Sequence, residues 1–253
     1  MKRNISILIT LIFCLMIFMP VSVSAETYPL AETDMSIQVD DSRWYVFTRD
    51  NIENNSELDE LGISYDTIQE ILYNNQAYMD AILFYDDGEY VEFFVRKKPL
   101  DIGVANLSNY ENSKVLEFAQ EVAKNQNSDT YSVYENEYKF AKSEYVDSDL
   151  GYYICEYVTI VNKDNYTFTF QSASQFSDSE HEEIKGIIDS VQFDIDTSLK
   201  EPQNTSLWSN VITKTVGGAV IGGVVSLITA FVNKKKKKKN ETDLQSYNDI
   251  SDQ

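Results

Sequence analysis

Cys155 and His181 are the two side chains whose types suit nucleophilic or acid–base chemistry. His181 is the single histidine, and Cys155 is the single cysteine beyond residue 25. Catalysis by an imidazole requires a nucleophile within about 3 Å and an acid that orients the ring. His181 has acidic neighbours but no partner nucleophile nearby in the sequence, which is typical of a helix surface. Cys155 lies in a β-rich run with apolar residues on both faces, which is typical of a small core residue. We therefore predict no catalytic residue.

Two acidic turns resemble calcium-binding segments. Residues 147–151 (DSDLG) begin like a calcium loop, and residues 86–89 (DDGE) are similarly acidic. Both lack the later oxygen ligands and the distal bidentate glutamate of such a loop. Asp and Gly also serve tight turns without a metal. The cysteine and histidine spacing matches no zinc motif. The sequence therefore predicts no metal ligand and no cofactor.

Residues 215–232 (TVGGAVIGGVVSLITAFV) form the sharpest interaction signal. Eighteen uncharged residues give roughly 27 Å of helix, close to the thickness of the bilayer hydrocarbon. Small residues recur every fourth position and include a GxxxG pattern, which permits close helix packing. These helix-association positions are Gly218, Gly222, Ser226 and Ala230. The partner helix belongs either to a second copy of the chain or to another membrane protein.

The flanks of this stretch predict its orientation. Trp208 suits an interfacial anchor at the outer end, and an uninterrupted lysine block suits the cytoplasmic end and contact with the lipid bilayer. The block comprises Lys234, Lys235, Lys236, Lys237, Lys238 and Lys239. At the amino terminus, Lys2 and Arg3 precede an apolar run, and Val-Ser-Ala at 23–25 resembles a signal-peptide cleavage site.

Charge is unevenly distributed along the chain. Residues 26–206 contain 12 of the 21 basic and 37 of the 41 acidic residues, so the net charge of this part is 12 − 37 = −25. A domain this acidic repels nucleic acid and anionic lipid headgroups. This charge either favours cations or basic partners or simply keeps the domain soluble.

Hydrophobic periodicity predicts strands interrupted by helices. The strands expected are 35–39, 43–48, 78–85, 89–96, 131–134, 138–146, 152–161, 166–172 and 191–193. The helices expected are 56–61, a helix capped by Ser64, 113–126 capped by Asn112, and one opened by the capping box Ser177–Glu180 and ending near Ser190. Strands that follow one another as hairpins favour an antiparallel sheet and an α+β fold.

Three runs resemble the PsbP-like domains of Gram-positive bacteria: MSIQVDDSRWYVFTRD, LGISYDTIQEILYNNQAYMDAILFYDDGEYVEFFV and EEIKGIIDSVQF. The resemblance covers about residues 30–193. It implies an α/β/α sandwich with a central, largely antiparallel sheet. Its motifs are structural, so no functional residue is carried over.

These observations together predict five segments. They are a signal peptide (1–25), a PsbP-like extracytoplasmic domain (26–193), a juxtamembrane linker (194–210), one carboxy-terminal transmembrane helix (211–232) and a lysine-rich stop-transfer segment with a short cytoplasmic tail (233–253). We expect a single-pass cell-membrane protein that acts as a non-catalytic binding or accessory module. An extracytoplasmic carboxylate-based hydrolase and a membrane signalling subunit are the alternatives.

Overall fold

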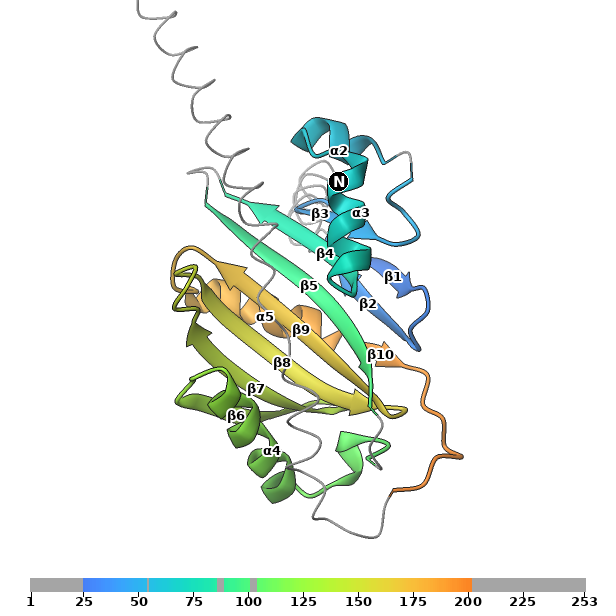
Figure 1. Ribbon diagram of the computed structural model, residues 1–253, viewed down its shortest axis with the longest axis vertical. Coiled ribbons are helices and arrows are strands. Elements are labelled where there is room, and N and C mark those ends of the chain that lie inside the picture. Colours follow the sequence, from blue (N-terminus) through green and yellow to red (C-terminus); the bar gives the residue numbers. More distant parts are fainter. Residues whose placement is uncertain (1–24, 54, 86–88, 101–103, 202–253) are drawn as a thin grey trace, which may run out of the picture.

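A seven-stranded antiparallel sheet forms the centre of the computed structural model, which describes residues 25–53, 55–85, 89–100 and 104–201 (Figure 1). Every neighbouring pair of strands in this sheet is antiparallel. In spatial order the strands are β3 (Trp44–Thr48), β4 (Ala77–Phe84), β5 (Tyr90–Pro99), β9 (Asp164–Ser172), β8 (Tyr153–Val161), β7 (Lys139–Val146) and β6 (Thr130–Glu135).

Tight turns set the register of the hairpins. Asn162 and Lys163 join β8 to β9, and both have positive φ, at 53° and 67°. This conformation is typical of the two-residue turn that matches the twist of antiparallel strands. In the β4–β5 hairpin the Tyr85 N–H donates to the Glu89 carbonyl at 2.9 Å, which continues the pairing of Phe84 with Tyr90.

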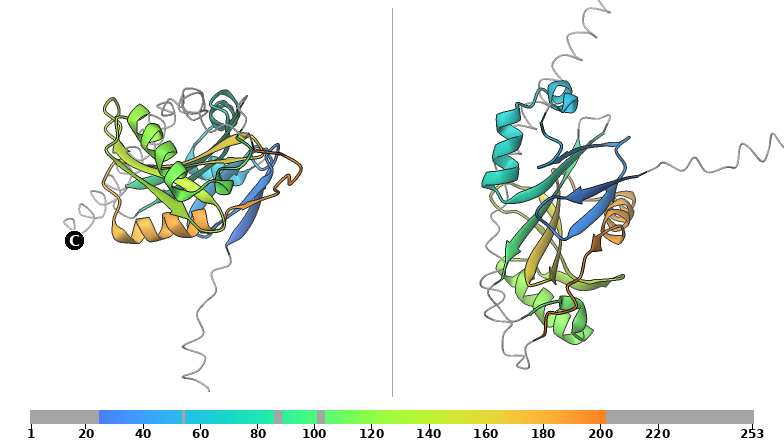
Figure 2. Two further views of the ribbon diagram at one scale, coloured as in Figure 1. Left: turned by 90° about the horizontal axis from the view of Figure 1, so that it is seen from below. Right: turned by 90° about the vertical axis from the view of Figure 1, so that its right-hand side faces the viewer.

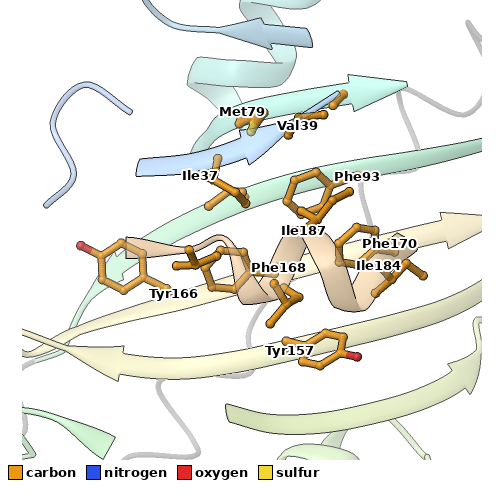
Figure 3. Packing of buried hydrophobic residues seen from close by; sticks show 14 of the residues in the cluster. Ile37, Val39, Met79, Phe93, Tyr157, Tyr166, Phe168, Phe170, Ile184 and Ile187 are labelled. Carbon is orange, nitrogen blue, oxygen red and sulfur yellow. The ribbon is translucent and has the colours of Figure 1, made fainter. Parts of the chain in front are cut away.

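A second layer covers one face of the large sheet. It contains helix α5 (Asp178–Asp189) and a three-stranded antiparallel sheet of β1 (Glu26–Leu30), β2 (Met35–Val39) and β10 (Gln192–Phe193). Figure 3 shows side chains from both layers converging in the largest core, where the Phe93 and Phe170 rings stack at 4.3 Å. Labelled there are Ile37, Val39, Met79, Phe93, Tyr157, Tyr166, Phe168, Phe170, Ile184 and Ile187.

Helices in two groups cover the opposite face, as the two views of Figure 2 show. The first group, α2 (Ser56–Leu61), α3 (Tyr65–Gln69) and the π-helical turn η1 (Glu70–Asn74), packs on β3, β4 and β5. The second, the 3₁₀ turn η2 (Leu107–Asn109) and α4 (Asn112–Asn125), packs on β7 and β8. Each of these two groups buries its own apolar cluster. Because α5 covers the other face, the large sheet has helices on both faces.

The predicted α+β class with a large antiparallel sheet is confirmed. The capping box is confirmed as well: Ser177 Oγ accepts from the Glu180 N–H, and Glu180 Oε2 accepts from the Ser177 N–H. Gly62 ends α2 in the left-handed region, at φ 66°. The predicted signal peptide and transmembrane helix lie outside the described residues. Within the described residues, none of the helices is long and apolar enough to cross a bilayer.

Two local predictions are wrong. Asn112 does not cap α4; it is the first helical residue, the cap position is Glu111, and the Asn112 amide donates to Glu135 instead. Residues 26–30, for which no strand is predicted, form β1. The strands expected at 35–39 and 43–48 form as β2 and β3, but they enter different sheets. Local pattern cannot reveal which of two stacked sheets a strand joins, because that choice depends on distant partners.

Residues 194–201 lie against the domain, although the composition of this segment predicts a linker. The Asp194 N–H donates to the Asp34 carbonyl at 2.8 Å, and the Asp196 N–H donates to Asn162 Oδ1 at 2.9 Å. The Glu201 carboxylate then accepts four hydrogen bonds: from the N–H groups of Ala105 (2.9 Å) and Asn106 (2.7 Å), from Asn109 Nδ2 (2.9 Å) and from Tyr110 Oη (2.9 Å). Glu201 therefore fixes the described end of the chain to residues 105–110, around the 3₁₀ turn η2.

Candidate functional site

The helix-covered face of the large sheet carries a row of buried polar side chains, which we call the buried acid row: Asp80, Glu92, Glu156, Thr169 and Gln171. Strand register explains the row. Glu92 on β5 is directly opposite Gln171 on β9, and Glu156 on β8 is directly opposite Thr169. Asp80 on β4 pairs with Phe94, two residues beyond Glu92 on the same face. Asp80 and Glu92 have no exposed surface, and Glu156 is 5% exposed.

Asp80 and Glu92 form a carboxyl pair. A hydrogen bond joins them when one carries a proton, and the Gln171 amide donates to the Glu92 Oε2 atom. If both groups were ionised, the two Asp80 oxygens would have no hydrogen-bond donor among the described residues. An unpaired charge in such a place is strongly unfavourable. Burial therefore favours protonation of this pair over the doubly ionised state.

Burial governs the protonation of this pair. It raises the pKa of Asp80 to about 7, although the hydrogen bond from Glu92 acts in the opposite direction. Burial also raises the pKa of Glu92 well above its usual range, and the neighbouring negative charge of Asp80 adds to this effect. Two nearby carboxyl groups whose environments favour different protonation states can supply an acid and a base. Such chemistry also requires access for a substrate.

Glu156 has a different environment from the carboxyl pair. Its carboxylate accepts hydrogen bonds from Thr169 Oγ1, at 3.1 Å, and from the Gln126 amide, and Arg96 Nη2 lies 3.9 Å away. Gln126 in turn accepts from Ser143 Oγ at 2.7 Å. Burial raises the pKa of Glu156, whereas Arg96 and these hydrogen bonds lower it. Because Gln126 is the C-cap of α4, this network fastens the helix end to the sheet.

A second group lies on the opposite face of the sheet and contains Glu144, Cys155 and His181. One potential ligand atom from each side chain lies within 4.8 Å of the other two. Glu144 on β7 is directly opposite Cys155 on β8, and His181 lies near the start of α5. Cys155 is fully buried, while Glu144 and His181 are partly exposed. Burial raises the pKa of the Cys155 thiol to about 12, so the thiol retains its proton.

Cys155 and His181 therefore lie side by side, which the separate treatment of the two residues in the sequence did not anticipate. Cys155 is in the core, as the sequence predicts. His181 is in a helix, as predicted, and its ring also contacts Phe176 at 5.8 Å between ring centroids. A protonated thiol is a poor nucleophile. The geometry therefore does not turn this group into a ready catalytic dyad.

The acidic turn at 147–151 behaves as a hairpin turn. Asp147 Oδ1 accepts from the N–H groups of Asp149 (2.9 Å) and Leu150 (2.8 Å), and Gly151 has φ 74°. The other acidic turn, 86–89, falls mostly outside the described residues. The predicted helix-association and membrane-anchoring residues lie wholly outside them. These are Gly218, Gly222, Ser226, Ala230, Trp208 and Lys234 to Lys239.

The sequence analysis did not single out the buried acid row, although a signal for it exists. Asp80, Glu92 and Glu156 each interrupt an otherwise apolar strand, in AYMDAILF, YVEFFV and YICEYVTIV. A charge in the middle of such a strand indicates a paired or protonated group, since unpaired charges are rarely buried. The hairpin of β4 and β5 places Asp80 near Glu92, but β8 joins the row only through the sheet order, which the pattern does not reveal.

Comparisons with known proteins give little further information. No family model matches the chain, and no curated protein matches it. A solved crystal structure from Bacteroides thetaiotaomicron VPI-5482 is similar over 67% of this chain, with 13% sequence identity and a TM-score of 0.33. The matched part spans 48% of that chain, about half its length. A similarity this weak carries no argument about function.

Proposed function

We propose that this chain is a non-catalytic, single-pass membrane protein whose extracytoplasmic domain is a binding or accessory module of a bacterial cell envelope. The observation that carries the proposal is the enclosure of the carboxyl pair and of the Cys155 thiol. Asp80, Glu92 and Cys155 have no exposed surface, so none of them contacts solvent or a substrate. The exposed acids instead give the domain an acidic exterior suited to cations or basic partners.

The proposal includes the topology and the family. The apolar stretch 211–232, the lysine block that follows it and the amino-terminal leader support an external domain with a short cytoplasmic tail. The antiparallel sheet with helices on both faces is compatible with a PsbP-like domain. The docking of residues 194–201 through Glu201 supports a domain held next to its membrane anchor rather than on a long free linker.

Crosslinking in the native membrane tests the proposal. Full-length protein is captured after crosslinking, and the recovered partners are compared with those of a Gly218→Leu/Gly222→Leu variant. A matched control, Val220→Leu/Val224→Leu, adds bulk to a different face of the same predicted helix. We expect partners that the glycine variant loses and the control keeps. If both variants recover the same partners as the wild-type protein, the small residues at the helix-association positions have no role in assembly. The external domain then becomes the binding element.

One observation favours a carboxylate-based hydrolase as the second candidate. Asp80 and Glu92 are neighbouring buried carboxyl groups with raised pKa values, and an aspartic peptidase uses a carboxyl pair of this kind. Turnover of peptides or wall fragments by full-length protein, lost in a folded Asp80→Asn variant, would establish the hydrolase and overturn the non-catalytic proposal.

A further inference from the structure

Three elements bring a mixed sulfur, nitrogen and oxygen donor set together in one place. Glu144 and Cys155 are register partners on β7 and β8, so both side chains point toward the α5 layer. His181 reaches the same place from α5, and the ligand atoms of the three residues all lie within 4.8 Å of one another. These residues are separated by 11 and 26 positions in the sequence, so only the hairpin and the packing of α5 assemble them.

We propose that Glu144, Cys155 and His181 form a binding site for a thiophilic divalent cation, with Zn²⁺ as the expected occupant. Thiolate, imidazole and carboxylate are the three side-chain ligands that Zn²⁺ uses in proteins. Sites for Ca²⁺ and Mg²⁺ are built from oxygen ligands and have no use for a buried thiol. Three protein donors leave the fourth tetrahedral position for water or for a donor from a partner.

Small side-chain movements bring the group to coordination geometry. Bonds of about 2.0–2.3 Å to a tetrahedral Zn²⁺ place its ligand atoms about 3.3–3.7 Å apart. The three ligand atoms, within 4.8 Å of each other, therefore need to approach by about 1 Å. Cys155 is held in the core, but Glu144 and His181 are partly exposed and can turn toward it. The backbone can therefore stay in place.

The surrounding charges have opposing effects on a bound cation. Lys142 Nζ pairs with Glu144 Oε1 at 2.6 Å and lowers the affinity for a second positive charge. The Oε2 atom of Glu144 is not part of this ion pair and is available as a ligand. Glu180 and Glu182 flank His181 on α5 and favour a cation nearby. Binding also displaces the thiol proton, so affinity increases as the pH rises.

Metal titration of untagged, chelator-treated, full-length protein in detergent tests the site. Co²⁺ is the spectroscopic probe, because thiolate ligation gives a charge-transfer band and tetrahedral geometry gives intense visible bands. We expect both features at one equivalent, their loss when Zn²⁺ displaces Co²⁺, and no competition from Ca²⁺ or Mg²⁺. Zn²⁺ is also expected to raise the melting temperature by tying α5 to the sheet.

Variants separate ligation from simple packing. Cys155→Ser should abolish the charge-transfer band. His181→Gln and Glu144→Gln each remove a direct ligand. Each should therefore weaken Zn²⁺ binding by more than about tenfold, which is the smallest loss typical when only a hydrogen-bond partner of a ligand is changed. His181→Gln keeps the test valid if Cys155→Ser fails to fold. Glu182→Gln removes a neighbouring charge without removing a ligand and should bind normally. The proposal is overturned if wild-type protein gives no thiolate band with Co²⁺, or if His181→Gln binds as well as wild type.

Discussion

Trp44 and Glu183, which are 139 residues apart in the sequence, join the first strand of the large sheet to the last helix. The Trp44 indole N–H donates to Glu183 Oε1 at 2.8 Å, and the Trp44 side chain is almost fully buried. Arg43 Nη1 donates to the same oxygen at 3.0 Å from a more exposed position. These hydrogen bonds connect β3, the edge strand of the large sheet, to α5 in the second layer.

Trp44→Phe is expected to destabilise the protein by about 1–2 kcal/mol beyond the lost ring area, because Glu183 loses a partly buried donor. Chemical denaturation measures this change. Arg43→Gln is the control, since an exposed ion pair contributes less than about 1 kcal/mol. Equal effects of the two substitutions would contradict the assigned role of the indole hydrogen bond.

The Asp80–Glu92 pair predicts an unusual pH dependence of stability. The pKa of Asp80 is about 7 in the folded protein and about 4 in the unfolded chain, so the folded state binds the proton more tightly. This contribution to stability is complete below about pH 4 and is lost as the pH rises toward 7. Burial raises the pKa of Glu92 as well, in the same direction.

Asp80→Asn/Glu92→Gln removes both titrating groups while keeping the size and shape of the two side chains nearly unchanged. Between pH 4 and 8 we expect wild type to lose roughly 2–4 kcal/mol relative to this variant, since each tenfold change in proton affinity corresponds to about 1.4 kcal/mol. Unfolding curves measured across this range give the difference. The exposed pair Asp59→Asn/Glu60→Gln removes the same charges from α2 and should follow the wild-type curve. If the stability of wild type and of the buried-pair variant changed with pH in the same way, the raised proton affinity of the pair would be refuted.

Glu201→Ala is expected to release the described end of the chain from residues 105–110, around the 3₁₀ turn η2. Four hydrogen-bond donors lose their acceptor, yet no apolar core residue is altered. Limited proteolysis should therefore cut within residues 194–201 much faster, while the melting temperature falls by only a few degrees. Ser198→Ala leaves the Glu201 contacts intact and serves as the control. Unchanged cleavage rates would show that the segment is held by other contacts.

Ser177→Ala is expected to cost about 1 kcal/mol, because it removes the side-chain acceptor of the capping box at the start of α5. Ser179→Ala lies two residues further on and keeps the Glu180 contacts with the Ser177 backbone, so it should have a smaller effect. Thermal unfolding distinguishes the two. A larger loss in Ser179→Ala would show that the Ser177 hydroxyl is not the main cap.

Local chemistry accounts for what the sequence predicts well. Alternating apolar residues, the Ser177–Glu180 capping box and the left-handed Gly62 depend on neighbours within a few positions, and they give most strands and helix ends correctly. The pairing of β5 with β9, as in Val91 with Ser172, joins residues about eighty positions apart and has no local signal. Both side-chain groups depend on such distant contacts: Glu92 meets Gln171 only once the sheet is ordered, and His181 meets the hairpin partners Glu144 and Cys155 only once α5 packs on the sheet.

The contacts of Glu201 shorten the tether that would join the domain to the proposed transmembrane helix. If the transmembrane helix begins at residue 211 as the sequence predicts, only nine residues, 202–210, separate it from the anchored Glu201. A fully extended chain covers at most about 3.5 Å per residue, so this tether reaches about 30 Å. Had the linker been free from residue 194, its reach would have been nearly twice as long. With such an anchor, partners of the domain would have to meet it within this distance of the membrane surface.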